Sequence, residues 1–286
     1  MGCYKLKSIC ALAVVLNSIY GVSSIQYFND LRARFSPNPS QGYYELPWNT
    51  SSPLMSNYVQ VPANSRLPLK FYCYPNDPRV CLMFDFKGNI AGIQISFLYQ
   101  DVMAFQSYYN YGTVGSFIEN IIFNTPVYSM RAYFTNPETL TMAGRQDTSQ
   151  TVEGLWVVLN NTLYDIQVQE PSPSQKSIGP FFRQNCYPGM GQHYFFQVNE
   201  FAQCNQMTPF YPVYARGVLA GFGIAEFGRG STAPGGRVWY ENPPQPAVDE
   251  ILTNRPPCMD QYLDAFGIYS LHVYFIDHPW KISCPA

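Results

Sequence analysis

The chain has 286 residues, a formal net charge of −2 at pH 7, only 13% charged residues and 16% aromatic residues. This weak negative balance argues against nucleic acid or an anionic membrane as the partner, because both require a concentrated basic face. Twenty-four prolines and 20 glycines interrupt the chain too often for long helices, and the many tyrosines and phenylalanines favour strands.

The first residues have the pattern of an export signal. Lys5 and Lys7 precede the apolar residues 8–16, and the small residues 21–24 suit a signal peptidase. The apolar run is well short of the roughly 20 residues that span a bilayer. We therefore expect residues 1–24 to be a signal peptide and the protein to be secreted, with no membrane span. Loss of the two lysines changes the net charge from −2 to −4.

The pattern beyond the signal predicts one domain. Residues 25–68 show little periodicity and are expected to form an irregular N-terminal arm, and residues 69–286 a single β-rich domain. Within the latter, residues 93–99 alternate between apolar and polar as in a half-buried strand, and residues 258–266 carry apolar side chains at helical spacing before Gly267. The expected strands are residues 69–74, 80–86, 90–99, 155–159, 164–169, 194–198, 210–215, 218–227 and 269–276.

These elements predict the fold class. Short strands joined by turns indicate a mainly β protein, an antiparallel β-sandwich or barrel-like domain with one or two short helices, stapled by disulfides. Six cysteines follow the signal, and an even number in an exported chain indicates three disulfides: Cys73, Cys81, Cys186, Cys204, Cys258 and Cys284. Six cysteines permit 15 pairings, of which the simplest joins neighbours along the chain.

Two N-x-[ST] sequons predict glycosylation, at Asn49 and at Asn160. No cofactor is indicated, because the Gly-rich residues 228–236 lack the lysine and spacing of a phosphate loop. No metal site is indicated either, since no C-x₂-C pair and no closely spaced histidine pair occurs.

Three histidines are the candidates for chemistry: His193, His272 and His278. His193 and His272 fall in or beside expected strands and could meet across a sheet, as a catalytic or metal-binding pair. They could equally form only hydrogen bonds within the sheet. There is no G-x-S-x-G motif, and all six cysteines are accounted for by disulfides. The carboxylates in or near structured segments do not reveal a catalytic pair: Asp85, Glu119, Glu153, Asp165, Glu200 and Glu226.

Several segments together resemble a known family. They are residues 80–85, residues 90–94, Cys186 with residues 188–194, residues 212–214 and residues 217–223. In combination they are similar to secreted arthropod proteins that include members from true-bug venoms, heteropteran venom family 2. The resemblance covers roughly residues 70–284. It implies a secreted protein from a venom gland and supplies no catalytic residues.

Two functions follow from the sequence. The first is a secreted, non-enzymatic venom component that binds an extracellular target or a small ligand. The second is a secreted metal-dependent or hydrolytic enzyme built around His193 and His272, and the separation of the two imidazoles distinguishes the hypotheses. A structural egg or cuticle protein fits the tyrosine content but not the absence of repeats.

Overall fold

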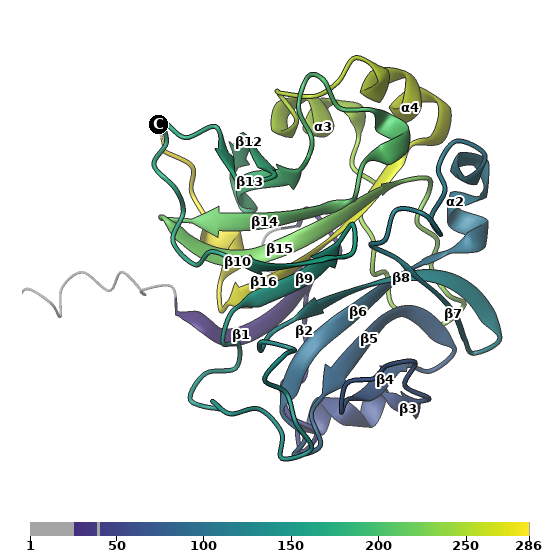
Figure 1. The fold of residues 1–286 in the computed structure, drawn as a ribbon, viewed down its shortest axis with the longest axis vertical. Coiled ribbons are helices and arrows are strands. Elements are labelled where there is room, and N and C mark those ends of the chain that lie inside the picture. Colours follow the sequence, from purple (N-terminus) through teal and green to yellow (C-terminus); the bar gives the residue numbers. More distant parts are fainter. Residues whose placement is uncertain (1–25, 39–40, 286) are drawn as a thin grey trace, which may run out of the picture.

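The computed structural model describes residues 26–38 and 41–285, so the expected signal peptide lies outside the described residues. Two antiparallel sheets of eight strands each make up the fold (Figure 1). The first, sheet A, has the strand order β11 (Ser177–Ile178), β12 (Phe181–Tyr187), β13 (Gly191–Phe196), β14 (Phe210–Ala215), β15 (Val218–Phe227), β16 (Ile268–Ile276), β1 (Tyr27–Arg34) and β2 (Tyr43–Glu45).

The second sheet, sheet C, is built mostly from the N-terminal half of the chain. Its order is β10 (Thr162–Ile166), β9 (Leu155–Leu159), β8 (Thr125–Tyr133), β6 (Ile90–Leu98), β5 (Asp77–Phe84), β4 (Lys70–Tyr74) and β3 (Val59–Val61), and β7 (Ile118–Ile122) pairs with β8. Both sheets keep free edge strands in the described part of the chain, so the expected antiparallel sandwich is confirmed in preference to a closed barrel.

Short helices complete the fold. They are α2 (Tyr99–Gln106), α3 (Gln245–Ile251), α4 (Cys258–Phe266) and the 3₁₀ turns η1 (Pro53–Asn57), η2 (Cys204–Gln206) and η3 (Pro279–Lys281). The expected helix is α4, which ends as predicted at Gly267, a residue with φ of 75° that suits glycine. None of the helices in the described ranges is long and apolar enough to cross a membrane.

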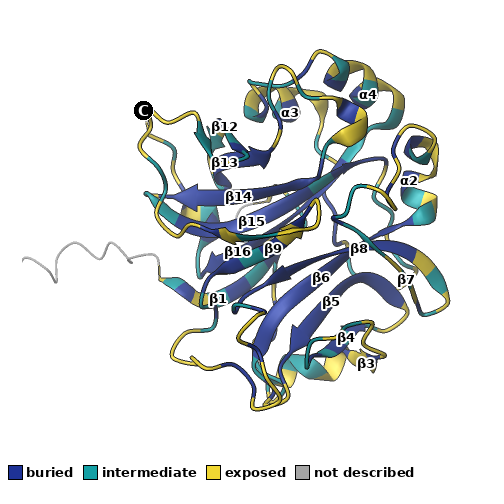
Figure 2. Cartoon of the chain, in the orientation of Figure 1, coloured by how far each residue is buried: buried dark blue, intermediate teal, exposed yellow. Residues whose placement is uncertain are grey.

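The main core lies between the inner faces of the two sheets. Phe134, directly after β8, contacts Phe275 and Phe222 of sheet A, with ring centroids 5.3 and 6.4 Å apart, and Phe97 of β6 contacts Tyr269 at 5.6 Å. Figure 2 shows the central strands of both sheets buried along most of their length. Burial of so many rings accounts for the high aromatic content, because each large ring removes much apolar surface from water.

Three expectations about local structure need correction. The N-terminal arm is not irregular, since β1 and β2 extend sheet A and β3 extends sheet C. Strand β6, expected to be half-buried, is buried at all nine residues, because a second apolar cluster covers the outer face of sheet C. The prolines of residues 243–246 predict a loop, but the last two of these residues already belong to α3, with Pro246 in its first turn, where proline is well tolerated.

All six expected cysteines form disulfides, but only one of the neighbour pairings is correct. Cys73 and Cys81 join β4 to β5 across their hairpin as expected. The other two bonds are Cys186–Cys284 and Cys204–Cys258, with sequence separations of 98 and 54. The pairing of neighbours was wrong there because strand order, not proximity in sequence, places β12 beside the C-terminal tail.

The two sequon asparagines lie at turns. Asn160 is exposed between β9 and β10, and Asn49 is half-buried, with its amide donating to the side chain of Asn89 at 3.1 Å. Glycosylation of both stays a prediction.

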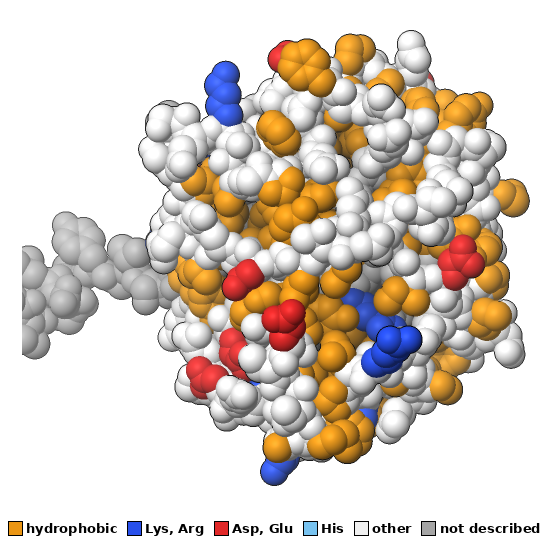
Figure 3. All heavy atoms as spheres, viewed as in Figure 1, with side chains coloured by type: hydrophobic (Ala, Val, Ile, Leu, Met, Phe, Trp, Pro, Cys, Tyr) orange, Lys and Arg blue, Asp and Glu red, His pale blue; other side chains and the backbone are white. Residues whose placement is uncertain are grey.

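On the face shown in Figure 3, hydrophobic side chains gather in the hollow over β13 and β14, whereas charged side chains are few.

Candidate functional site

A row of paired residues crosses the outer face of sheet A. Tyr211 on β14 pairs with Gly223 on β15, Gly223 pairs with His272 on β16, and His272 pairs with Arg34 on β1. Side chains of residues paired in this way point to the same face. The neighbours Leu271 and Val273 are buried in the main core, so His272 points away from that core.

Gly223 allows the side chains of Tyr211 and His272, which lie on either side of it, to meet. A Cβ atom at this position would lie 2.3 Å from the ring of Tyr211, so only glycine lets the phenol lie flat across β15. The Tyr211 hydroxyl thereby reaches Nε2 of His272 at 3.1 Å.

Glu241 reaches the same place from a long connection. Its backbone exchanges two hydrogen bonds with Ser270 of β16, at 2.8 and 2.9 Å, which continues sheet A beyond the end of β1. Its carboxylate then lies 3.1 Å from Nε of Arg34 and 3.4 Å from Nδ1 of His272. Because a carboxylate only accepts, it favours the tautomer of His272 with the proton on Nδ1 and the phenol of Tyr211 donating to Nε2.

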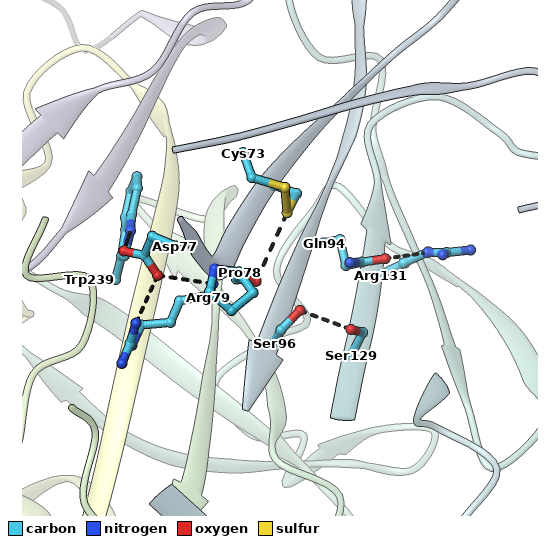
Figure 4. Close-up of a disulfide and its surroundings, with 10 residues drawn as sticks. Cys73, Asp77, Pro78, Arg79, Gln94, Ser96, Ser129, Arg131 and Trp239 are labelled. Carbon is cyan, nitrogen blue, oxygen red and sulfur yellow. Dashed lines mark hydrogen bonds and ion pairs between the residues drawn. A yellow bond between two sulfur atoms is a disulfide. The ribbon is translucent and has the colours of Figure 1, made fainter. Parts of the chain in front are cut away.

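The connection that carries Glu241, residues 228–244, is called the strap here. Sheet C fixes it: the indole nitrogen of Trp239 donates to Asp77 at 3.0 Å, and the hydroxyl of Tyr240 donates to the carbonyl of Ser96 at 2.7 Å. Asp77 is fully buried and pairs with Arg79 at 2.9 Å. Figure 4 shows Asp77, Arg79 and Trp239 near the Cys73–Cys81 disulfide, with the Trp239 ring directed at Asp77.

A second anchor of the strap is an aromatic cage around Arg237. The guanidinium carbon lies 4.5 to 5.8 Å from the centroids of four rings, and both sheets contribute to them: Tyr44, Tyr58, Tyr74 and Trp239. Cation–π contacts of this kind stabilise a partly buried arginine. The strap therefore holds Glu241 against sheet A through contacts made largely with sheet C.

His193 completes the cluster from β13. Its ring lies 5.8 Å from the ring of His272 and 5.4 Å from that of Tyr211, between centroids. Its Nδ1 lies 3.2 Å from the carbonyl of Asn185 and so carries the proton, since a carbonyl only accepts. Nε2 has no hydrogen-bond partner among the described residues. The five side chains are at most 8% exposed: Arg34, His193, Tyr211, Glu241 and His272.

A cavity of about 600 Å³ lies over this cluster. Its walls are mainly apolar and come from β13, α3, β16 and the C-terminal tail, including Phe195, Val248, Leu252, Ile268, Trp280 and Ile282. The Gly189 amide donates to the Ile282 carbonyl at 2.9 Å, and the Cys186–Cys284 disulfide ties the same tail to β12. The lining matches the usual ligand pocket, which is apolar with a few convergent polar groups.

Burial sets the charge state of the cluster. Desolvation, helped by neighbouring His272, lowers the pKa of His193 to about 3, although the carbonyls of Asn185 and Gly191 oppose it. Desolvation also lowers the pKa of His272, against the opposing effect of Glu241. Burial raises the pKa of Tyr211 far above its usual value. At neutral pH the site therefore holds two neutral imidazoles, a neutral phenol and the Arg34–Glu241 ion pair.

The lowered pKa of His193 predicts a pH dependence of stability. Between pH 6.5, its ordinary pKa, and about 3, the unfolded chain binds a proton at His193 that the folded chain does not. The free energy of unfolding must therefore fall as the pH falls through this window. In urea titrations below pH 5.5, the wild type should lose stability more steeply than His193→Gln, by up to about 1.4 kcal/mol per pH unit. Above pH 7 the two slopes should agree, and equal slopes below pH 5.5 would contradict the assignment.

The structure brings together the two histidines that the sequence suggested and separates the third. His278 lies in the C-terminal segment, 2.6 Å from the carboxylate of Asp277. Arg34, Tyr211 and Glu241 were missed: Arg34 lies in the supposed irregular arm, and Glu241 lies in a Pro-rich connection with no motif.

Among the described residues, no group of three or more His, Cys, Asp or Glu side chains is placed to hold a metal ion. No protein-family model, curated protein or solved structure matches this chain.

Proposed function

We propose that the chain is a secreted binding protein that holds a small, largely apolar molecule in the cavity on the outer face of sheet A. The observation that carries this proposal is the cavity of about 600 Å³ with apolar walls and a buried polar cluster on its floor. The floor is built on five neighbouring strands, and rigid elements hold binding groups more accurately than loops do.

Secretion is supported by two features. The described chain contains three disulfides, and such bonds form and persist mainly in the oxidising compartments that secreted proteins pass through. The N-terminal sequence also has the pattern of a signal peptide. A role in venom rests on the sequence resemblance alone.

The alternative, a histidine-dependent enzyme, gains from the short distance between His193 and His272 and from the adjacent Glu241. The charge states favour binding instead. An imidazole with a pKa near 3 is a weak base at neutral pH, and a phenol with a raised pKa stays protonated, so it is a poor nucleophile and acts only as a neutral hydrogen-bonding group. We therefore infer binding without turnover.

The fluorescent probe N-phenyl-1-naphthylamine tests this function, because it is uncharged and brightens in apolar surroundings. The full secreted chain should bind it at one site. Ala247→Phe, on the cavity side of α3, should weaken binding at least ten-fold by filling the space. The matched control is Ala104→Phe on the exposed face of α2, which should leave binding unchanged. Equal affinity of both variants, or no binding by the wild type, would overturn the proposal.

A further inference from the structure

The charges around the cavity are already balanced. Among the described residues that line it, Arg34 is the one cationic side chain and Glu241 the one anionic side chain, and they pair with each other at 3.1 Å. The two histidines are neutral for the reasons given above. A charged ligand group would lose its hydration here without meeting a free countercharge, which is strongly unfavourable in a buried site.

Three buried nitrogens on the floor make no hydrogen bond within the described residues. Nδ1 of His272 faces the carboxylate of Glu241 at 3.4 Å, whereas the other two face no described partner and differ in kind. Nε2 of His193 bears a lone pair, because the proton of this imidazole lies on Nδ1. Nη1 of Arg34 bears only hydrogens, and no described group accepts from it. Buried polar atoms are nearly always paired, so this combination indicates a group that both donates and accepts. A hydroxyl does both, whereas an ether only accepts and a carboxylate is charged.

From the balanced charge, the unlike pair of nitrogens and the apolar walls, we infer that the ligand is an uncharged amphipathic alcohol with its hydroxyl on the floor beside His193 and Arg34. Its apolar body lies against the walls formed by α3, Phe195 and the tail segment with Trp280. This inference rests on the proposed function, since it names the class of molecule that the same cavity takes.

Competition against bound N-phenyl-1-naphthylamine tests the inference with three molecules that share a ten-carbon chain. They are 1-decanol, decyl methyl ether and decanoate, measured on the full chain at pH 7.5. Decanol should displace the probe at a concentration about ten-fold lower than either of the others, because it alone satisfies both nitrogens without bringing a charge.

His193→Leu removes the acceptor and should reduce the preference for decanol over the ether to within two-fold, while Ala104→Phe should keep it. If decanoate or the ether competes as well as decanol against the wild-type protein, the inference fails even though the cavity binds the probe. If the probe itself does not bind, the proposed function fails. If the His193→Leu variant does not fold, the competition of decanol, decyl methyl ether and decanoate against the wild-type protein is sufficient to test the inference.

Discussion

Replacing Glu241 by glutamine should lower the free energy of unfolding by about 3–5 kcal/mol, measured by urea denaturation at pH 7.5 with the disulfides intact. The substitution keeps the shape of the side chain but leaves the guanidinium of Arg34 charged and buried, 5% exposed, without its carboxylate. Removal of one member of a buried pair costs far more than the pair itself contributes, because the remaining charge stays desolvated.

Two further variants show whether the effect belongs to the buried charge. Combining Glu241→Gln with Arg34→Met removes both charges and should restore most of the lost stability. Asp260→Asn breaks the exposed pair between Arg255 and Asp260 and should change stability by less than about 1 kcal/mol. If Glu241→Gln is as mild as Asp260→Asn, the ion pair is open to solvent and the argument for an uncharged ligand loses its basis.

Local sequence signals predicted those elements whose geometry is decided by neighbouring residues. The hairpin of β9 and β10 turns at Asn160 and Asn161, both with positive φ, and asparagine tolerates this conformation well. Helix α4 and the Cys73–Cys81 bond across a tight hairpin belong to the same class. In each case the residues that determine the structure lie within about ten positions of one another.

The candidate site is determined instead by strand order. Period-2 alternation predicted strands around His193 and His272, but alternation does not say which strands are neighbours. The last strand, β16, pairs with the first, β1, and this pairing brings Arg34 beside His272. Glu241 depends on the strap, whose anchors Asp77 and Ser96 lie in the other sheet. Contacts between such distant segments leave no local pattern that a single sequence displays.

The second large effect concerns the disulfide beside the cavity. The double substitution Cys186→Ser, Cys284→Ser opens a loop with a sequence separation of 98 and should lower the free energy of unfolding by about 4–5 kcal/mol on chain-entropy grounds. The matched control, Cys73→Ser with Cys81→Ser, opens a separation of only 8 and should cost about 2–3 kcal/mol. Urea denaturation of both variants, with the remaining disulfides intact, makes the comparison.

Removal of the two disulfides should differ more in its effect on probe binding than in its effect on the free energy of unfolding. The Cys186–Cys284 bond holds the tail whose residues Trp280 and Ile282 form one wall of the cavity, whereas Cys73–Cys81 lies in sheet C. Affinity for N-phenyl-1-naphthylamine should therefore fall at least ten-fold in the Cys186→Ser, Cys284→Ser variant and stay unchanged in the Cys73→Ser, Cys81→Ser variant. The measurement is made at pH 7.5 without urea, where both variants are folded. An unchanged affinity in both would mean that the Gly189–Ile282 hydrogen bond and the packing of Trp280 suffice to hold the wall, and that the disulfide acts only on the unfolded chain.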